Sequence, residues 1–478
     1  MDKYKLLASN ALLISIGTFG SKVLVFLMVR FYTEYLPPSD YGTADLLTQT
    51  TNLLIPFVSL GIIDGVFRFA IDHADSGAKI FTTGFRTVIM GTVILTASLP
   101  LWGGLHVLRG YGWLVVISVT ASCLHSLCSQ YIRAKGNTLL YAVQGVLNTS
   151  LVISLNIILL AVFHRGIAGY VLSVAAADLI TALFLAAKEK LWLLLGERPD
   201  RPLSSAMFHY CVPLIPVSIF WWITSVSDRF MITSFLGSEA TGIYAVSCKI
   251  PTIMTLLSSV FMEAWQFSAI AEADEGREAH ARFFSRVWDF FYTCMFTAGA
   301  LVTGLSKLEI DLLADEGYYE AWKSVPILTL AMIFSAFSAF LGSAYLVEKK
   351  SGQTLQTAAL GAAVNICLNA LLIPSPLWTS GAGIATLVSY LSVFTVRVIS
   401  VRKLIPFKMD LRKIAAGTIL LAIQSLFLIL HLPLSVPVQA ACVLMTALMC
   451  RKTICLGAKT GIRMGQDLLK RSGPPGSS

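Results

Sequence analysis

Residues 138–163 read TLLYAVQGVLNTSLVISLNIILLAVF, a stretch without a charged side chain that follows Arg133 and Lys135 and ends before Arg165. At a rise of about 1.5 Å per residue, roughly 20 apolar residues make a helix long enough to cross the hydrocarbon core of a bilayer. The stretch therefore predicts a transmembrane helix between basic loops. Similar apolar runs, separated by short polar breaks, continue along the chain in both directions.

The composition of the whole chain points the same way. Of the 478 residues, 56% are hydrophobic and only 13% are charged, whereas a soluble globular chain carries about 25% charged residues. The net charge of +9 is typical of some nucleic-acid-binding proteins, but here the basic residues lie in short loops rather than on one soluble face. The composition excludes a soluble fold, and we expect no nucleic-acid partner.

The alternation of apolar runs and polar breaks predicts an all-α integral membrane protein of about fourteen transmembrane helices. The apolar run that follows Lys3 and Lys5 is too long for a signal peptide and lacks a small-residue cleavage site, so we expect an uncleaved first helix. The predicted spans are residues 8–33, 42–70, 80–105, 112–133, 138–163, 167–187, 207–236, 240–268, 282–304, 323–346, 354–373, 381–400, 411–430 and 434–450.

The positions of the basic residues predict the orientation of these spans. Most of the 36 Lys and Arg residues fall in every second loop, on the side of both termini, whereas the remaining loops hold Arg109, Arg165, Lys307 and Lys323. Because basic residues accumulate in cytoplasmic loops, both termini are expected in the cytoplasm.

The chain also resembles itself at an offset near 200 residues. Residues 35–42 (YLPPSDYG) match residues 235–242 (FLGSEATG), and Phe67 and Phe267 keep the same spacing. We therefore predict two six-helix lobes, 1–200 and 201–405, followed by two appended helices in 406–455 and a cytoplasmic tail over 456–478. Since six is even, both lobes enter the membrane in the same orientation and enclose a central cavity, as in parallel-repeat transporters.

Charged and amide side chains inside the spans concentrate on the first two helices of each repeat. An ionisable group at a helix centre costs about 2.5–3.5 kcal/mol on insertion scales, so it usually faces a cavity or a partner. Arg offers a fork of donors to a phosphate and Lys a compact charge. We predict a cavity for a large polar anion that is lined by Lys22, Arg30, Gln49, Asn52, Arg229 and Lys249.

Four acidic residues are candidates for ion coupling or gating, because burial favours the neutral form of a carboxyl group: Asp64, Asp178, Asp228 and Glu263. Structural roles stay open for several charged residues. Arg30 and Asp45 also suit the outer membrane interface, and Asp228 with Arg229 suits a structural pair. Asp64 and Glu263 also suit helix caps or ion pairs with residues such as Arg68.

Catalytic and metal-binding signatures are absent from the sequence. It contains no HExxH, GxSxG or phosphate-binding loop and no metal-spaced Cys/His set. The acidic loop over residues 309–320 is too short for the catalytic domain of a membrane glycosyltransferase. We expect no enzyme, no metal and no cofactor.

With these features the chain resembles the multidrug/oligosaccharidyl-lipid/polysaccharide (MOP) exporter superfamily, in particular its bacterial polysaccharide or O-antigen flippases. The resemblance covers essentially the whole chain. It rests on Asn10, Gly17 and Ser21-Lys22 in the first span, on Tyr41-Gly42 after an acidic turn, and on the repeat with two appended helices. It implies a flippase that moves an undecaprenyl-pyrophosphate-linked oligosaccharide from the cytoplasmic to the outer leaflet by alternating access, for surface polysaccharide synthesis.

The resemblance also implies Lys22, Arg30, Arg229 and Lys249 as headgroup cations and the appended helices as part of a groove for the lipid tail. It implies a monomer in the bacterial cytoplasmic membrane, surrounded by membrane lipids and working beside polysaccharide assembly proteins. Whether a proton, a sodium ion or the membrane potential drives transport stays open. So do three related functions: lipid II flippase of peptidoglycan synthesis, a sporulation-type relative, and cation-coupled multidrug exporter.

Overall fold

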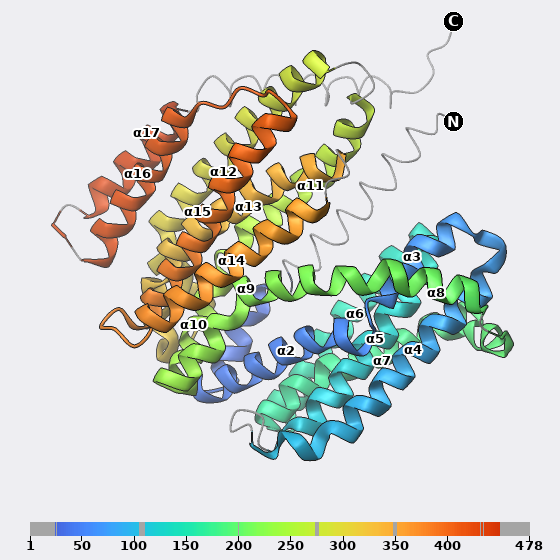
Figure 1. The fold of residues 1–478 in the computed structure, drawn as a ribbon. Helices are drawn as coiled ribbons and strands as arrows, with labels where there is room; N and C mark the ends of the chain where they lie inside the picture. The colour runs from blue at the N-terminus through green and yellow to red at the C-terminus, as the bar shows by residue number, and fades with distance from the viewer. Residues whose placement is uncertain are drawn as a thin grey trace, which may run out of the picture. The chain divides into compact units, whose positions relative to one another are not determined.

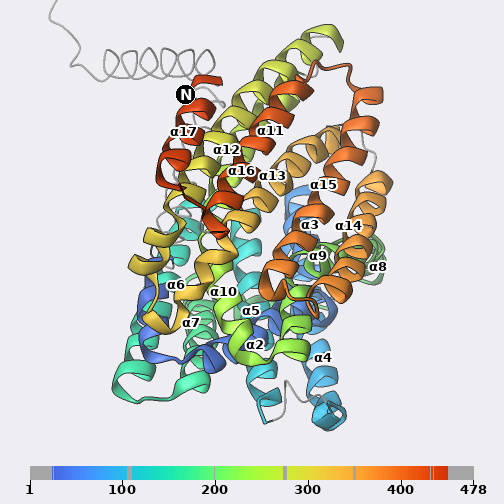
Figure 2. The same ribbon diagram turned by 90° about the vertical axis from the view of Figure 1, so that its left-hand side faces the viewer.

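The computed structural model describes residues 24, 26–104, 110–198, 200–272, 277–347, 351–430, 432–433 and 435–449. Every regular element in these ranges is a helix (Figure 1, Figure 2). Contacts divide the chain into two compact units: residues 1–249, 310–321 and 358–385 form the first, and residues 250–309, 322–357 and 386–478 form the second. The predicted all-α fold class is confirmed, whereas the lobe boundaries drawn from the sequence repeat stay a prediction.

The first unit holds most of the amino-terminal half of the chain. Residues 26–35 are helical, and the α-helices that follow are α2 (Pro38–Val58), α3 (Ile62–Asp72), α4 (Gly77–Ser98), α5 (Gly112–Ala134), α6 (Thr138–Asn156), α7 (Gly166–Glu189), α8 (Arg201–Cys211), α9 (Ile215–Leu236) and α10 (Ser238–Lys249). Short 3-10 helices are η1 (Ala74–Ser76), η2 (Leu99–Gly104), η5 (Leu191–Gly196) and η6 (Val212–Leu214), and η4 (Ile157–Val162) is a π-helix.

The remaining helices belong wholly or partly to the second unit. They are α11 (Thr252–Glu272), α12 (Arg277–Leu313), α13 (Val325–Val347), α14 (Ser351–Leu372), α15 (Trp378–Leu404), α16 (Leu411–Ile429) and α17 (Ser435–Met449), with the 3-10 helix η8 (Glu316–Lys323) between α12 and α13. The unit boundary runs through α12, η8, α14 and α15, so parts of these helices pack in the first unit.

Ten helices of the described residues are long and apolar enough to cross a bilayer, and a bent pair makes an eleventh. The apolar helix Ser435–Leu448 is shorter. The predicted spans from residue 42 onward fall on helical segments, and those over 42–70, 207–236 and 240–268 each include more than one α-helix. Most of the first predicted span lies outside the described residues. The chain is therefore a multi-pass membrane protein, and the count of fourteen spans stays a prediction.

The span predicted over residues 42–70 is broken: α2 and α3 meet at an angle of 51°. The Gly61 N–H donates to the Pro56 carbonyl at 3.2 Å and the Leu60 N–H to the Phe57 carbonyl at 3.3 Å, the bonding pattern of a Schellman motif. Leu60 takes the left-handed position of this motif, with φ 49°, and Gly61 follows with φ 67°. A left-handed turn ends an α-helix, so the single predicted span becomes two helices.

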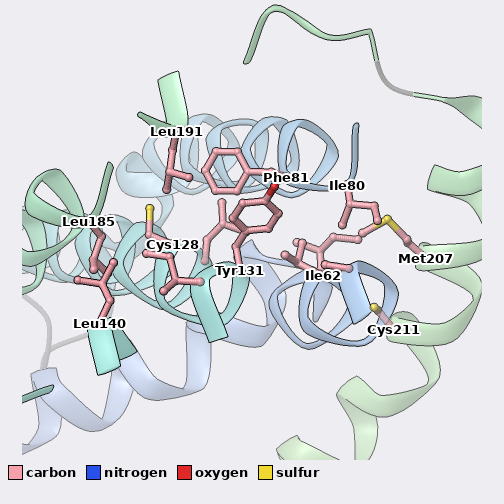
Figure 3. Close-up of a cluster of buried hydrophobic side chains, with 14 residues drawn as sticks. Ile62, Ile80, Phe81, Cys128, Tyr131, Leu140, Leu185, Leu191, Met207 and Cys211 are labelled. Carbon is pink, nitrogen blue, oxygen red and sulfur yellow. The ribbon is translucent and has the colours of Figure 1, made fainter. Parts of the chain in front are cut away.

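The core of the first unit contains one apolar cluster, formed by side chains from α3 to α8 (Figure 3). Phe81 of α4 packs against Tyr131 of α5, with ring centroids 5.0 Å apart. In a membrane this packing acts through close van der Waals contact, because lipid tails are as apolar as the side chains themselves. Other fully buried members are Ile62, Val66, Ile80, Leu127, Ile132, Leu185, Leu191, Met207 and Cys211.

The second unit has an aromatic core around Trp288 of α12, whose ring lies 5.1 Å from that of Phe337 and 5.3 Å from that of Phe340. Arg397 is buried in the same unit, at 2% exposure. Its Nη1 donates to the Ser338 carbonyl at 2.6 Å and its Nε to Thr357 Oγ1 at 3.1 Å. Arg397 lies inside α15, which continues past it to Leu404.

Candidate functional site

The helices that carry much of the predicted cavity, α2 and α10, cross in direct backbone contact. A Cβ atom added to Gly42 would overlap the Ser238 carbonyl oxygen, and one added to Gly242 would overlap the Pro38 carbonyl oxygen. Only glycine permits so close an approach of two membrane helices. Asp45 follows about one turn after Gly42, and Lys249 follows about two turns after Gly242.

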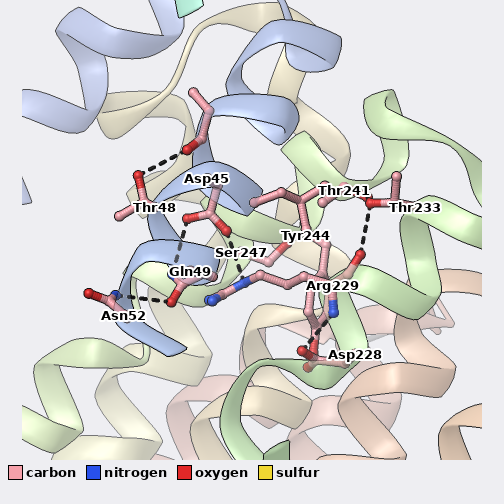
Figure 4. A network of polar contacts seen from close by, with 12 residues as sticks. Asp45, Thr48, Gln49, Asn52, Asp228, Arg229, Thr233, Thr241, Tyr244 and Ser247 are labelled. Atoms are coloured by element: carbon pink, nitrogen blue, oxygen red, sulfur yellow. Dashed lines mark hydrogen bonds and ion pairs between the residues drawn. The ribbon is translucent and has the colours of Figure 1, made fainter. Parts of the chain in front are cut away.

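An ion pair buried in the first unit connects α2 with α9. Arg229 extends from α9 toward α2, and its Nε lies 3.3 Å from Asp45 Oδ2 (Figure 4). The two side chains are only 10% and 4% exposed. The contact is an ion pair without the alignment of a hydrogen bond. In this conformation, therefore, the charge of the predicted headgroup cation Arg229 is compensated by Asp45.

Asp228 is bound within the same unit, but by other groups. Its Oδ1 accepts from the backbone N–H of Arg229 at 2.9 Å, and its Oδ2 accepts from the Tyr244 hydroxyl at 2.6 Å. Both Asp228 and Tyr244 are buried. Hydrogen bonds to a carboxylate are among the stronger ones in proteins, so Asp228 fixes α9 against α10. The sequence left open a structural pair between the Asp228 and Arg229 side chains. In the structure the Arg229 side chain pairs with Asp45 instead.

A chain of amides leads from the buried ion pair to the surface along α2. Gln49 Nε2 donates to Asp45 Oδ1 at 3.4 Å, and Asn52 Nδ2 donates to Gln49 Oε1 at 3.3 Å (Figure 4). The Trp222 indole N–H donates to the Gln49 carbonyl at 3.1 Å and joins α9 to this stripe. Asn52 is exposed, so the stripe ends in an amide that can reach a ligand.

The other predicted cations have different environments. Lys249, the last residue of α10, is half-buried and forms no hydrogen bond or ion pair with the residues that the structure describes. The Arg30 guanidinium donates to the Ala314 carbonyl and, at 3.4 Å, to the Asp311 carbonyl. These carbonyls lie at the carboxyl end of α12, where a helix attracts positive charge. Lys22 lies outside the described residues.

Asp64 and Glu263 are the acidic candidates on α3 and α11. Asp64 is exposed in the first turn of α3, where a negative charge is favourable next to the helix N-terminus. The alternative pairing of Asp64 with Arg68 is not formed, because Arg68 pairs with Asp72 at 3.1 Å. Glu263 belongs to α11, and its side chain lies outside the described residues.

Asp178 lies in a second polar cluster of the first unit, between α5, α6 and α7. Its carboxyl group is within hydrogen-bonding distance of Ser122, His125 and Asn148. His125 was not among the predicted site residues, because one histidine in an apolar span forms no sequence motif. His125 could have been found from another feature: three neighbouring spans each carry buried or half-buried polar side chains, which are costly in a membrane.

The described residues hold no group of three or more His, Cys, Asp or Glu side chains placed to bind a metal ion. What the α2, α9 and α10 residues offer is a half-buried ammonium group, a guanidinium group and amides. Such groups bind and orient an anionic or sugar-like ligand through charge and hydrogen bonds. We therefore treat them as a candidate binding site.

A protein-family model described as polysaccharide biosynthesis protein matches residues 7–266, more than half of the chain. This match includes α2, α9, α10 and the α5–α7 cluster. A comparison with curated proteins finds no match.

Several solved structures share the fold. An inward closed conformation of the lipid II flippase MurJ aligns with a TM-score of 0.67 at 13% identity, over 93% of this chain and 100% of that one. An inward-facing multidrug resistance MATE family transporter of the MOP superfamily aligns with a TM-score of 0.65 at 13% identity, over 80% and 94%. A mutant of the Vibrio cholerae MATE transporter VcmN gives 0.58 at 14% identity, over 84% and 97%. At such identities the likeness concerns the fold.

Proposed function

The chain belongs to the polysaccharide biosynthesis protein family of the MOP superfamily, and from that premise we propose that it is a flippase for an undecaprenyl-pyrophosphate-linked oligosaccharide. The substrate would pass from the cytoplasmic to the outer leaflet of the bacterial cytoplasmic membrane, with both termini of the chain in the cytoplasm. The observation that carries this proposal is the family match over residues 7–266. The fold shared with a lipid II flippase supports it.

In this proposal the pyrophosphate binds at the cationic residues of the first unit. Lys249 forms no ion pair with the described residues, and Gln49 and Asn52 supply amide groups from α2. Arg229 is held by Asp45 at 3.3 Å, so a diphosphate competes with Asp45 for the guanidinium group. Lys22 and Arg30 complete the set of headgroup cations.

Transport then proceeds by alternating access of two lobes, residues 1–200 and 201–405, around the bound headgroup. Asp64, Asp228 and Glu263 act at the gates between the two states. The helices in 406–455 lie beside the lipid tail, and the basic tail over 456–478 stays in the cytoplasm. The protein works as a monomer together with polysaccharide assembly proteins and catalyses no covalent step.

The second candidate is transport of lipid II for peptidoglycan synthesis. The likeness to the lipid II flippase MurJ over 93% of this chain favours it. Both candidate substrates share the undecaprenyl-pyrophosphate group, so the cationic site serves either. They differ in the attached sugars and peptide, which only a comparison of cargoes separates. Because the fold also resembles that of MATE transporters, multidrug export is a third candidate function to be tested.

Complementation distinguishes these functions. The full chain is expressed in one strain that lacks its O-antigen flippase and in another that lacks its lipid II flippase, and lipid-linked intermediates are quantified in both. We expect surface glycan to return and the intermediate to fall in the first strain. Rescue of the second strain alone would identify lipid II as the cargo, and lowered drug sensitivity without either rescue would indicate a multidrug exporter.

A further inference from the structure

The polar cluster between α5, α6 and α7 converges on the carboxyl group of Asp178. Ser122 Oγ donates to Oδ2 at 2.5 Å, and Asn148 Nδ2 donates to Oδ1 at 2.9 Å. His125 Nδ1 lies 2.9 Å from Oδ1, and the His125 and Asp178 side chains are only 15% and 13% exposed. All of these residues belong to the first unit, and none of them is used by the headgroup site.

The second ring nitrogen of His125 also faces an acceptor. Its Nε2 lies 2.7 Å from Gln144 Oε1, while the other end of the same amide, Gln144 Nε2, donates to Ser129 Oγ at 3.1 Å. A neutral imidazole carries one N–H only, so it can donate to one acceptor and not to both. The two contacts are both hydrogen bonds only when the His125–Asp178 pair holds one proton more than a neutral histidine with a carboxylate.

The additional proton can be bound either by His125 or by Asp178. Either His125 is an imidazolium that donates to both Asp178 and Gln144, or Asp178 is protonated and donates to Nδ1 of a neutral ring. In both cases the pair carries no net charge, which suits its position inside a membrane protein. After the proton is released, the pair carries one buried negative charge, partly balanced by the hydrogen bonds from Ser122 and Asn148.

Release of the proton requires only a rotation of the Gln144 amide. When the Gln144 amide turns over, its Nε2 donates to the now unprotonated His125 Nε2 and its Oε1 accepts from the Ser129 hydroxyl. A serine hydroxyl is both a donor and an acceptor, so Ser129 serves either arrangement. Nδ1 then carries the remaining ring proton and donates to the Asp178 carboxylate. The cluster therefore has two discrete hydrogen-bond arrangements that differ by one proton.

We propose that His125 and Asp178 form a proton-binding site, with Gln144 as its positioning residue, and that exchange of one proton at this site drives the transport cycle. The first part stands on the geometry of the cluster, and the coupling rests on the proposed flippase function. In the exchange one proton passes from the pair to water, the hydrogen bonds of Gln144 rearrange, and no other covalent bond is made or broken.

Other titratable groups lie on the helices that form or pack against the cluster, which are α2 to α7 and the helix over residues 26–35. None of them is within hydrogen-bonding or ion-pair distance of His125 or Asp178 in the part of the chain that the structure describes, so the pair itself is the titrating unit. These groups are Arg30, Tyr32, Glu34, Tyr35, Asp40, Tyr41, Asp45, Asp64, Arg68, Asp72, Lys79, Arg86, Cys123, Cys128, Tyr131, Arg133, Tyr141, Tyr170, Lys188 and Glu189.

Proton release is measured on the full-length protein in lipid nanodiscs, without any lipid-linked substrate, by potentiometric titration and by infrared difference spectra of the carboxyl and imidazole bands. We expect wild type to release about one proton per molecule more than Asp178→Asn over the same pH range. His125→Gln should lose the same proton, and Ser122→Ala, which keeps both titrating groups, should retain it. Gln144→Glu, which places a carboxylate against Nε2, should still hold the proton at a pH at which wild type has released it.

Equal proton release by wild type and Asp178→Asn, together with unchanged imidazole bands, would overturn the site. The wild-type infrared spectrum alone tests it as well, so a variant that does not fold leaves the test intact. Glycan export measured in cells separates the coupling from the function. If wild type exports the glycan and titrates, but Asp178→Asn exports equally well, the coupling is wrong and the flippase stands. If wild type titrates but exports nothing, the proposed function is wrong and the proton site stands.

Discussion

Replacement of Arg229 by methionine tests whether the Asp45–Arg229 ion pair holds α2 against α9. The Asp45 side chain is 4% exposed, and without Arg229 it keeps one long hydrogen bond, from Gln49 at 3.4 Å, among the described residues. Removal of one partner from a buried ion pair costs about 3–5 kcal/mol, because the other charge stays buried. Arg229→Met should therefore lower the free energy of unfolding by about this amount. The double variant Asp45→Asn/Arg229→Met removes both charges of the pair and should recover most of the loss.

The assay is thermal unfolding of the purified full-length protein in detergent, followed by size-exclusion chromatography. Arg68→Met is the matched control, because Arg68 and Asp72 pair at 3.1 Å with side chains that are 63% and 45% exposed. Exposed pairs contribute about 0–1 kcal/mol, so this variant should unfold near the wild-type temperature. If Arg229→Met unfolded at the same temperature as Arg68→Met, the ion pair would not be the stabilising contact described. A double variant less stable than either single variant would contradict the reasoning equally.

Three further predictions concern the same region. Lys22→Ala and Lys249→Ala together should abolish glycan export while the protein still reaches the membrane. The control is the amount of variant protein in the membrane, and normal export by this double variant would exclude the cationic site. Gly242→Ala should destabilise the α2–α10 crossing by about 1–3 kcal/mol, because the new Cβ overlaps the Pro38 carbonyl oxygen. Its control is Gly145→Ala in α6, where a Cβ meets no atom within 4 Å, and this variant should unfold no earlier than wild type. Tyr244→Phe should cost about 1–3 kcal/mol, because one oxygen of the buried Asp228 loses its donor, and an unchanged unfolding temperature would show that this hydrogen bond does not stabilise the fold.

The helices could be predicted from the sequence because each apolar run must satisfy its backbone hydrogen bonds internally in a membrane. The run over residues 138–163 is an example: the structure has a helical span over Thr138–Val162. Where a run breaks was not predictable to the same extent. The span over 42–70 breaks between Ser59 and Gly61, where Leu60 adopts a positive φ that is unusual for its residue type.

The partners of the charged residues were the part that the sequence could not supply. Arg229 was grouped with the headgroup cations because it is a basic residue inside a predicted span, yet its side chain pairs with Asp45, far away along the chain. The same holds for His125, whose partners Gln144 and Asp178 lie on other helices. Periodicity shows which face of a helix is polar, but the neighbour of that face depends on how the helices pack.

The direct test of the central claim is movement of the lipid substrate across a bilayer by the purified protein. Proteoliposomes are prepared with a fluorescent undecaprenyl-pyrophosphate oligosaccharide, and the fraction accessible to a membrane-impermeant quencher is followed over time. The account predicts that wild type equilibrates the substrate between the leaflets and that the Lys22→Ala/Lys249→Ala variant does so no faster than protein-free liposomes. Wild-type transfer no faster than in protein-free liposomes, or equal transfer by wild type and variant, would contradict it.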